Sequence, residues 1–331
     1  MAGNSAPDAV GGVDYPRTLQ EFDDWFSSEA ACSAYLQRVR WREGFRCPNC
    51  AGRESWMTKT GHLKCRKCRR RTSATAGTIF ERTQKPLRVW FQAMWYVTSQ
   101  KSGGSALGLQ RVLGLGSYQT AWSWLHKLRR AMVRPGRDRL QGCVEVDETY
   151  VGGNEEGVRG RETRSKTIIV VAAEEDGRGI GRIRLRRVPD VSAENLHAFI
   201  EESVRPGSVV HTDGWKGYND IDQKGYTHQI TILSQHDEAA HKLMPRVHRV
   251  ASLLKRWLLG THYGAVSRKH LDYYLDEFTF RFNRRRSQAR GLLFYRLLQH
   301  AVKVDPVPYH GLVGGKSEPD HNMSYVVQAS G

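Results

Sequence analysis

The hydrophobic pattern of residues 86–132 predicts three consecutive helices. Residues 86–97 carry apolar side chains at three- and four-residue steps, the spacing of an amphipathic helix. Two glycines then end this segment, and a shorter helix is predicted over residues 105–113. Ser117 is a suitable N-cap for a third helix that runs to Met132. A helix, a glycine turn and a second helix are typical of helix-turn-helix DNA readers and also of plain helical hairpins.

From residue 143 onward the pattern becomes that of an α/β domain. Residues 143–151 alternate with a period of two, so Val144 and Val146 share one face of a strand while Glu145 and Asp147 share the other. The further elements predicted, in chain order, are strands over 167–173 and 180–188, a helix capped by Ser192, strands over 208–212 and 228–233, and helices carrying His248–Leu259 and Leu271–Phe278. The first three strands read as one meander, and the whole as a mixed sheet with helices.

Charge then narrows the class of partner. The 331 residues include 51 Lys and Arg against 34 Asp and Glu, a formal charge of +17. Such an excess suits a partner made of phosphates better than a small-molecule substrate. A hydrophobic fraction of 39% excludes a disordered polycation and predicts two or more domains. No apolar run approaches the ~18 residues of a membrane span, and residues 1–16 do not resemble a signal peptide, so we expect a reducing, cytoplasmic, nucleoid-associated location.

Four of the six cysteines have metal-binding spacing. Cys47, Cys50, Cys65 and Cys68 form C-x2-C-x14-C-x2-C, two knuckles that together supply the ligands of a tetrahedral structural zinc site. The alternative is four free or redox-active cysteines. The surroundings are rich in basic residues: Arg46, Arg53, Lys59, Lys64, Arg66, Lys67, Arg69, Arg70 and Arg71. A zinc-stapled module with this charge predicts a nucleic-acid contact, with Arg66, Lys67 and Arg69 as candidates, against the alternative of a merely solvated rim.

The third predicted helix carries a second basic group. Its polar and basic residues are expected to be exposed and to read the major groove, with Lys127, Arg129 and Arg130 as DNA contacts; the set is Gln119, His126, Lys127, Arg129 and Arg130. The alternative is simple packing of a helical hairpin.

Two aspartates are the candidate chemical groups of the second half. Asp147 lies in the strand 143–151, and Asp213 follows the strand 208–212 next to a glycine. We expect these strands to be adjacent, which would bring both carboxylates to one point. Carboxylate pairs hold Mg²⁺, and a pair of such ions clamps the oxygens of an in-line displacement at phosphorus.

The order of these parts along the chain is distinctive: a zinc ribbon, a helix-turn-helix, and then the phrases VEVDETYVGG, HTDGWKGY, HRVASLLKRWLLGTHYG and YLDEFTFRFNRRR. With this order the chain resembles bacterial insertion-sequence transposases of the DDE superfamily, in the ISXO-type group with an N-terminal zinc ribbon. The resemblance implies a ribonuclease H-like catalytic domain. It also implies DNA transposition and recombination: binding of terminal inverted repeats, followed by metal-dependent strand cleavage and strand transfer of the nuclease and nucleotidyltransferase kind.

The resemblance also assigns residues. The first two acids of the family match Asp147 and Asp213, and aligning the family's lysine with Lys255 puts the third metal ligand at His248, where relatives carry Glu or Asn. Imidazole is a softer donor than carboxylate, so Mn²⁺ is favoured relative to Mg²⁺. Glu277 is the rival third acid, and His248 could instead be a structural histidine or orient the scissile phosphate. Lys255 is expected to contact DNA near the cleaved phosphate, and Arg284 and Arg285 to lie near bound DNA.

The expected organisation is a helical leader over 1–45, a zinc ribbon over 46–75, a helix-turn-helix segment over 85–135, a catalytic domain over 140–304 and a flexible tail over 305–331. The expected partner is double-stranded DNA, both repeats and target, bound by a homodimer or larger assembly. The alternative function is a catalytically decayed or domesticated relative that still binds specific DNA. A nuclease or junction resolvase is disfavoured by the two DNA-binding modules.

Overall fold

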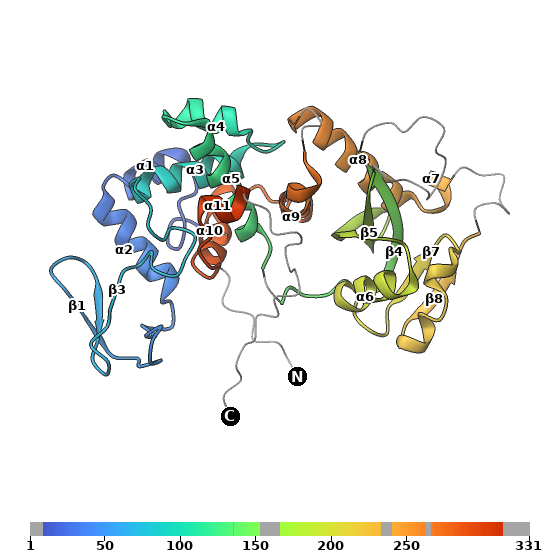
Figure 1. Ribbon diagram of the computed structural model, residues 1–331, viewed down its shortest axis with the longest axis horizontal. Coiled ribbons are helices and arrows are strands. Elements are labelled where there is room, and N and C mark those ends of the chain that lie inside the picture. Colours follow the sequence, from blue (N-terminus) through green and yellow to red (C-terminus); the bar gives the residue numbers. More distant parts are fainter. Residues whose placement is uncertain (1–8, 135, 153–165, 233–239, 263–265, 314–331) are drawn as a thin grey trace. The chain divides into compact units, whose positions relative to one another are not determined.

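The computed structural model describes residues 9–134, 136–152, 166–232, 240–262 and 266–313, which fall into two compact units (Figure 1). The first unit combines residues 9–134 with residues 287–313, and the second holds the described residues of 136–286. None of the described helices is both long and apolar enough to cross a membrane.

The first unit is helical around an aromatic core. Its helices are α1 (Leu19–Trp25), α2 (Glu29–Arg40), α3 (Leu87–Ser99), α4 (Ala106–Leu113), α5 (Tyr118–Met132), α10 (Arg290–Ala301) and α11 (Tyr309–Val313). Trp90 of α3 stacks on Trp124 of α5 with ring centroids 3.7 Å apart. Phe294 of α10 packs against Phe22, Phe26 and Phe91, so the late helix completes the core built by the early ones.

Residues 287–304, expected in the catalytic domain, therefore pack in the first compact unit. Helix α10 packs on α2, α3 and α5, and its Gly291 lies so close to the N-terminal segment that an added Cβ would stand 1.6 Å from the Pro16 carbonyl oxygen. Part of the expected tail is also ordered, because residues 309–313 form α11 against α5.

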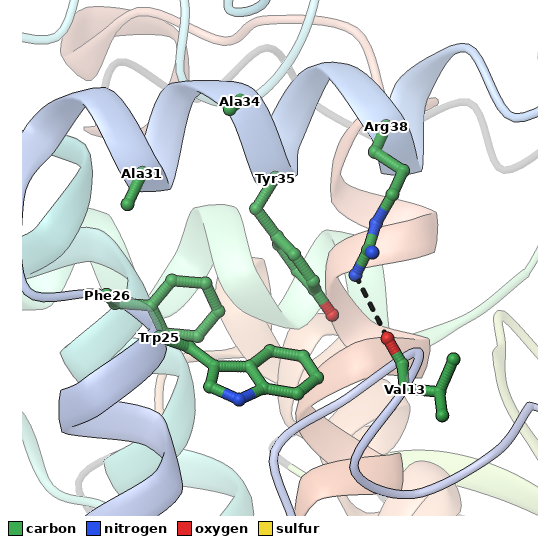
Figure 2. Close-up of a pocket in the computed structure, with 7 residues that line it drawn as sticks. All are labelled: Val13, Trp25, Phe26, Ala31, Ala34, Tyr35 and Arg38. Atoms are coloured by element: carbon green, nitrogen blue, oxygen red, sulfur yellow. Dashed lines mark hydrogen bonds between the residues drawn. The ribbon is translucent and has the colours of Figure 1, made fainter.

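A small pocket in this unit lies between the N-terminal segment and α2 (Figure 2). Its volume is about 320 Å³, and Trp25, Phe26 and Tyr35 supply aromatic walls. Arg38 lies over the Tyr35 ring and donates a 3.3 Å hydrogen bond to the Val13 carbonyl. None of the lining residues is a candidate site residue.

Helices α4 and α5 form the predicted pair joined by a glycine turn. Gly114 ends α4 in the left-handed conformation with φ 59°, and Ser117 caps α5 by accepting from the Gln119 amide. The expected exposure of α5 is wrong in part, since His126 is 0% and Arg129 2% exposed. These side chains pack in the core, while the first turn of α5 stays accessible.

The ribbon is a three-stranded antiparallel sheet of β1 (Ser55–Met57), β2 (Leu63–Cys65) and β3 (Arg71–Thr72). Trp56 pairs with Lys64, and Lys64 pairs with Arg71. Because side chains alternate across a strand, these three lie on the face opposite Cys65 and Thr72, which are buried.

The second unit contains a five-stranded sheet in the order β6-β5-β4-β7-β8. Its strands are β4 (Cys143–Val151), β5 (Thr167–Asp176), β6 (Gly179–Val188), β7 (Val209–Thr212) and β8 (Thr227–Ile230). β4, β5 and β6 are an antiparallel meander, whereas β7 runs parallel to β4 and β8 parallel to β7. This order with helices on both faces is ribonuclease H-like, as expected from the sequence.

Each face of the sheet has its own core. On one face α6 (Ala193–Ser203) and two short 3-10 helices (Lys216–Tyr218 and Asp222–Lys224) cover Val144, Val146 and Val170. On the other face α8 (Pro245–His262) and α9 (Leu271–Asn283), flanked by α7 (Ala240–Leu243) and a 3-10 helix (Arg268–His270), cover Ile169 and Val171. Figure 1 shows the sheet between these helices.

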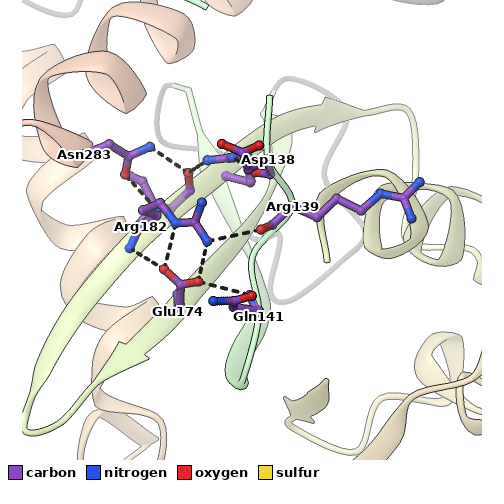
Figure 3. Close-up of polar contacts among 8 residues, drawn as sticks. Asp138, Arg139, Gln141, Glu174, Arg182 and Asn283 are labelled. Carbon is purple, nitrogen blue, oxygen red and sulfur yellow. Dashed lines mark hydrogen bonds and ion pairs between the residues drawn. The ribbon is translucent and has the colours of Figure 1, made fainter. Parts of the chain in front are cut away.

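A polar network fastens the start of this unit to β5 and β6 (Figure 3). Glu174 accepts from the Gln141 amide at 3.0 Å and from the Arg182 guanidinium at 2.8 Å. Arg182 also donates to the Arg139 carbonyl at 3.1 Å, and Asn283 brackets the backbone of β6. The segment before β4 is thus held by side chains of β5 and β6.

Candidate active site and zinc cluster

The two predicted aspartates lie on neighbouring parallel strands, as the sequence indicated. The β4–β7 ladder pairs Cys143 with Val209 and Glu145 with His211. Asp213 directly follows β7 (Val209–Thr212), so continuing this register by two residues would set it opposite Asp147. Each carboxylate uses Oδ1 to accept a backbone amide, that of Glu148 for Asp147 (2.8 Å) and that of Trp215 for Asp213 (2.9 Å).

Helix α8 brings a third candidate ligand to this edge. His248 Nε2 lies 3.8 Å from Asp147 Oδ2, and the two side chains are 31% and 17% exposed. Glu277, the rival acid, is fully buried on α9 and accepts from Arg281 one helical turn later at 2.8 Å. Because α9 packs on edge strand β6 while α8 packs on β4 and β5, the structure brings His248 rather than Glu277 to the strand of Asp147.

Glu145 fixes the start of α8. It is 1% exposed, on the same face of β4 as Asp147, and its Oε2 accepts the amides of Arg246 (2.8 Å) and Val247 (3.0 Å). Its Oε1 accepts from the Arg246 guanidinium at 2.7 Å. A carboxylate at a helix N-terminus satisfies unpaired amides and complements the helix dipole. The two anchored residues directly precede His248.

Tyr218, which sequence reasoning missed, lies next to the site but on the other face of the sheet. It is fully buried there and donates to Glu148 Oε2 at 3.2 Å, so Glu148 points away from Asp147. Burial, followed by the charges of Glu148, Asp147 and Asp213, raises the pKa of Tyr218. Three carboxylates therefore act on one phenol. The signal was its position in HTDGWKGY, five residues after Asp213.

This donor set fits a divalent cation at an open site. Ligands of an octahedral Mg²⁺ stand about 3 Å apart when adjacent and about 4 Å when opposite, which brackets the Asp147–His248 separation. Among the residues that the structure describes, only a cysteine group has three or more ligand atoms all within 4.8 Å. The acidic site is thus not a closed protein cage, and Mg²⁺ commonly keeps several waters.

Lys255 lies on α8, about 10 Å along the helix from His248. It is exposed, and its pKa is lowered by partial burial and then by the nearby Lys166, which precedes β5. Lys255 and Lys166 therefore bring two positive charges to the part of α8 that follows His248.

The four predicted zinc ligands form one cluster. The ligand atoms of Cys47, Cys50, Cys65 and Cys68 all lie within 4.8 Å of one another. The Sγ atoms of Cys47 and Cys68 are 3.5 Å apart, and those of Cys50 and Cys65 are 3.6 Å apart. A tetrahedral site with zinc–sulfur bonds of about 2.3 Å needs sulfur separations of about 3.8 Å. The cluster fits a structural zinc ion.

Comparison with known proteins finds two matching family models. Residues 139–283 match the family model of the ISXO2-like transposase domain, and residues 27–71 match that of the transposase zinc-ribbon domain. A protein in transposable element ISH50 of Halobacterium salinarum, itself uncharacterised, is 28% identical over 279 residues, 77% of this chain and 91% of its own. The chain thus contains a zinc-ribbon segment and a second domain that are both similar to those of ISXO2-like transposases.

Two further similarities are weaker. A transposase-like protein of Haemophilus influenzae is 26% identical over 35% of this chain and 92% of its own length. A chain of the Mos1 strand transfer complex is similar over 69% of this chain and 79% of its own, at 13% identity and a TM-score of 0.26, which is too low to add to the fold described above.

Some of the predicted DNA-contact residues of this chain are exposed, whereas others are buried or contact other parts of the fold. Arg66, Lys67 and Arg69 on the ribbon are exposed. Lys127 is half-buried, which lowers its pKa together with the charge of Arg130. Arg285 is committed to the fold, since its guanidinium donates to the carbonyls of Phe282, Gly181 and Ile180. Arg284 lies over the Phe280 ring at 4.2 Å.

Proposed function

We propose that the chain is a DNA transposase that binds the terminal inverted repeats of an insertion sequence and carries out metal-dependent strand cleavage and strand transfer. The observation that carries this proposal is the parallel pairing of β4 with β7, the strands that lead to Asp147 and Asp213, together with His248 Nε2 at 3.8 Å from Asp147. The matches to the ISXO2-like transposase domain and to the transposase zinc ribbon support it.

Asp147 and Asp213 would hold Mg²⁺ or Mn²⁺, with His248 as the third protein ligand. A bound ion of this kind supplies charge stabilisation to the attacking and leaving oxygens of an in-line displacement at phosphorus. The residues of the chain orient these ligands: backbone amides fix Oδ1 of both aspartates, and Glu145 fixes the start of the helix that carries His248. Lys255 is positioned to contact a DNA phosphate next to the site.

DNA binding is proposed for the first unit. Arg66, Lys67 and Arg69 of the ribbon supply affinity for phosphates, and the accessible first turn of α5 is the part of the helix pair that enters the major groove. Arg129 is removed from the proposed contacts because it is buried. Two element ends must be joined, which favours a homodimer or larger assembly on DNA.

Nicking of repeat DNA tests the proposal. The full chain is incubated with a labelled duplex of the inverted repeats that flank its gene, with Mg²⁺ or Mn²⁺. Asp147→Asn and Asp213→Asn should each abolish nicking while leaving DNA binding unchanged. Glu148→Gln is the matched control, since Glu148 neighbours Asp147 but faces Tyr218 on the other side of the sheet. Nicking that survives both aspartate substitutions would reject the assigned site.

The second candidate is a decayed relative that binds DNA without cutting it, and His248 in the place of an acid is the observation in its favour. The same assay separates the two, because a decayed relative would bind the repeats and nick them with neither metal.

A further inference from the structure

A tryptophan on the outer face of the ribbon holds two cations. Lys64 Nζ and Arg69 Cζ each lie 5.3 Å from the centroid of the Trp56 ring. Arg71 is the cross-strand partner of Lys64 on the same face. In the part of the chain that the structure describes, Lys64, Arg69 and Arg71 form no ion pair with a carboxylate. This face therefore carries three cations that are not neutralised by any acid of the described residues.

The zinc knuckle itself positions Arg69. Both knuckles end in the same turn: the Ala51 amide donates to the Cys47 carbonyl at 2.9 Å, and the Arg69 amide to the Cys65 carbonyl at 3.0 Å. Ala51 and Arg69 both have left-handed backbones, with φ 56° and 62°. This conformation is unfavourable for residues other than glycine, and the first knuckle has the small residue Ala51 at this position. In the second knuckle the same position directs a long cationic side chain over Trp56.

We propose that Trp56, Lys64, Arg69 and Arg71 form a clamp for the sugar–phosphate backbone of duplex DNA. The inference rests on the proposed function, because it takes DNA as the partner. Cations stacked on an aromatic ring are partly immobilised before binding, which reduces the entropy lost when each meets a phosphate. Since phosphates carry no base identity, the clamp adds affinity for any duplex and leaves the choice of sequence to other residues.

The salt dependence of binding tests the clamp. The full chain is bound without divalent metal to a repeat duplex and to a scrambled duplex of equal length over a series of salt concentrations. Lys64→Ala and Arg69→Ala should each reduce the slope of log K against log salt by ~0.9 on both duplexes. Lys59→Ala removes an equal charge from the loop between β1 and β2 and should leave the slope unchanged. Zinc content, measured on every variant, reports that the ribbon is intact.

The ring is tested separately. Trp56→Ala should weaken binding to both duplexes about 2- to 5-fold for each stacked cation, whereas Trp56→Phe should retain most of the affinity. Slopes equal to that of the parent in Lys64→Ala and Arg69→Ala, or an equal fall in Lys59→Ala, would overturn the clamp. Equal losses in Trp56→Phe and Trp56→Ala would overturn the role of the ring. If the parent binds neither duplex, the proposed function fails as well; if it binds and the variants match it, only the clamp fails.

Discussion

Glu145 on β4 holds Arg246 at the start of α8 through both its backbone amide (2.8 Å) and its guanidinium (2.7 Å). The same guanidinium donates to the carbonyls of Gly177 and Gly179 in the β5–β6 turn. One buried carboxylate thus ties a central strand, an edge turn and the helix that carries His248.

Replacing Glu145 by Ala should lower the free energy of unfolding by about 3–5 kcal/mol, because it leaves two backbone amides unsatisfied and removes the buried acid of Arg246, which keeps its more exposed partner Glu175. Urea unfolding of the parent and the variant measures this loss. Glu201→Ala is the control: its ion pair with Lys224 has both side chains more than 40% exposed and should cost no more than about 1 kcal/mol. Equal losses in the two variants would contradict the anchoring role.

Changes at His248 should alter the metal preference of nicking. His248→Glu supplies a harder oxygen donor, so the ratio of Mg²⁺-supported to Mn²⁺-supported nicking should rise. His248→Ala removes the third ligand and should weaken nicking with either metal by at least about 10-fold. Loss of a residue that only hydrogen-bonds to a metal ligand already costs about 10- to 100-fold in metal affinity or activity. A His248→Ala protein that nicks as well as the parent would remove the imidazole from the site.

Loss of zinc should affect the two units unequally. Cys65→Ser breaks the sulfur cluster, so the ribbon should lose its zinc and DNA binding should weaken, because metal binding and folding are coupled in such small modules. The ribonuclease H-like sheet belongs to the other compact unit and should unfold at the same denaturant concentration as before. Cys143→Ser is the matched control and should retain the metal. Equal zinc content in the Cys65 variant and the parent would refute the cluster.

Gly291→Ala should detach α10 from the first unit. The added Cβ would meet the Pro16 carbonyl oxygen and carbon at 1.6 and 2.8 Å, contacts that only a shift of backbone can relieve. We expect a loss of stability of several kcal/mol, at the high end for single substitutions. Gly260→Ala in α8 is the comparison, since nothing lies within 4 Å of its added Cβ, and it should be neutral or stabilising by up to about 1 kcal/mol. Thermal unfolding of both variants separates these outcomes.

Much of the fold and of the candidate site could be predicted from local sequence patterns. The three helices from Pro86 to Met132 and the strands of the second unit were predicted because their hydrophobic periods are regular. Arg129 was misjudged because a basic residue late in an amphipathic helix looks exposed until the helices around it are in place.

The order of residues alone determined the cysteine cluster and the pairing of the Asp147 and Asp213 strands, since ligand spacing and strand succession are properties of the chain itself. Only the tertiary structure decided that α10 completes the first unit, that Glu145 caps α8 and that His248, not Glu277, reaches the strand of Asp147. These outcomes depend on contacts between residues a hundred or more positions apart, such as Glu145 with Arg246, and no local period encodes which of several amphipathic helices will cover a given strand.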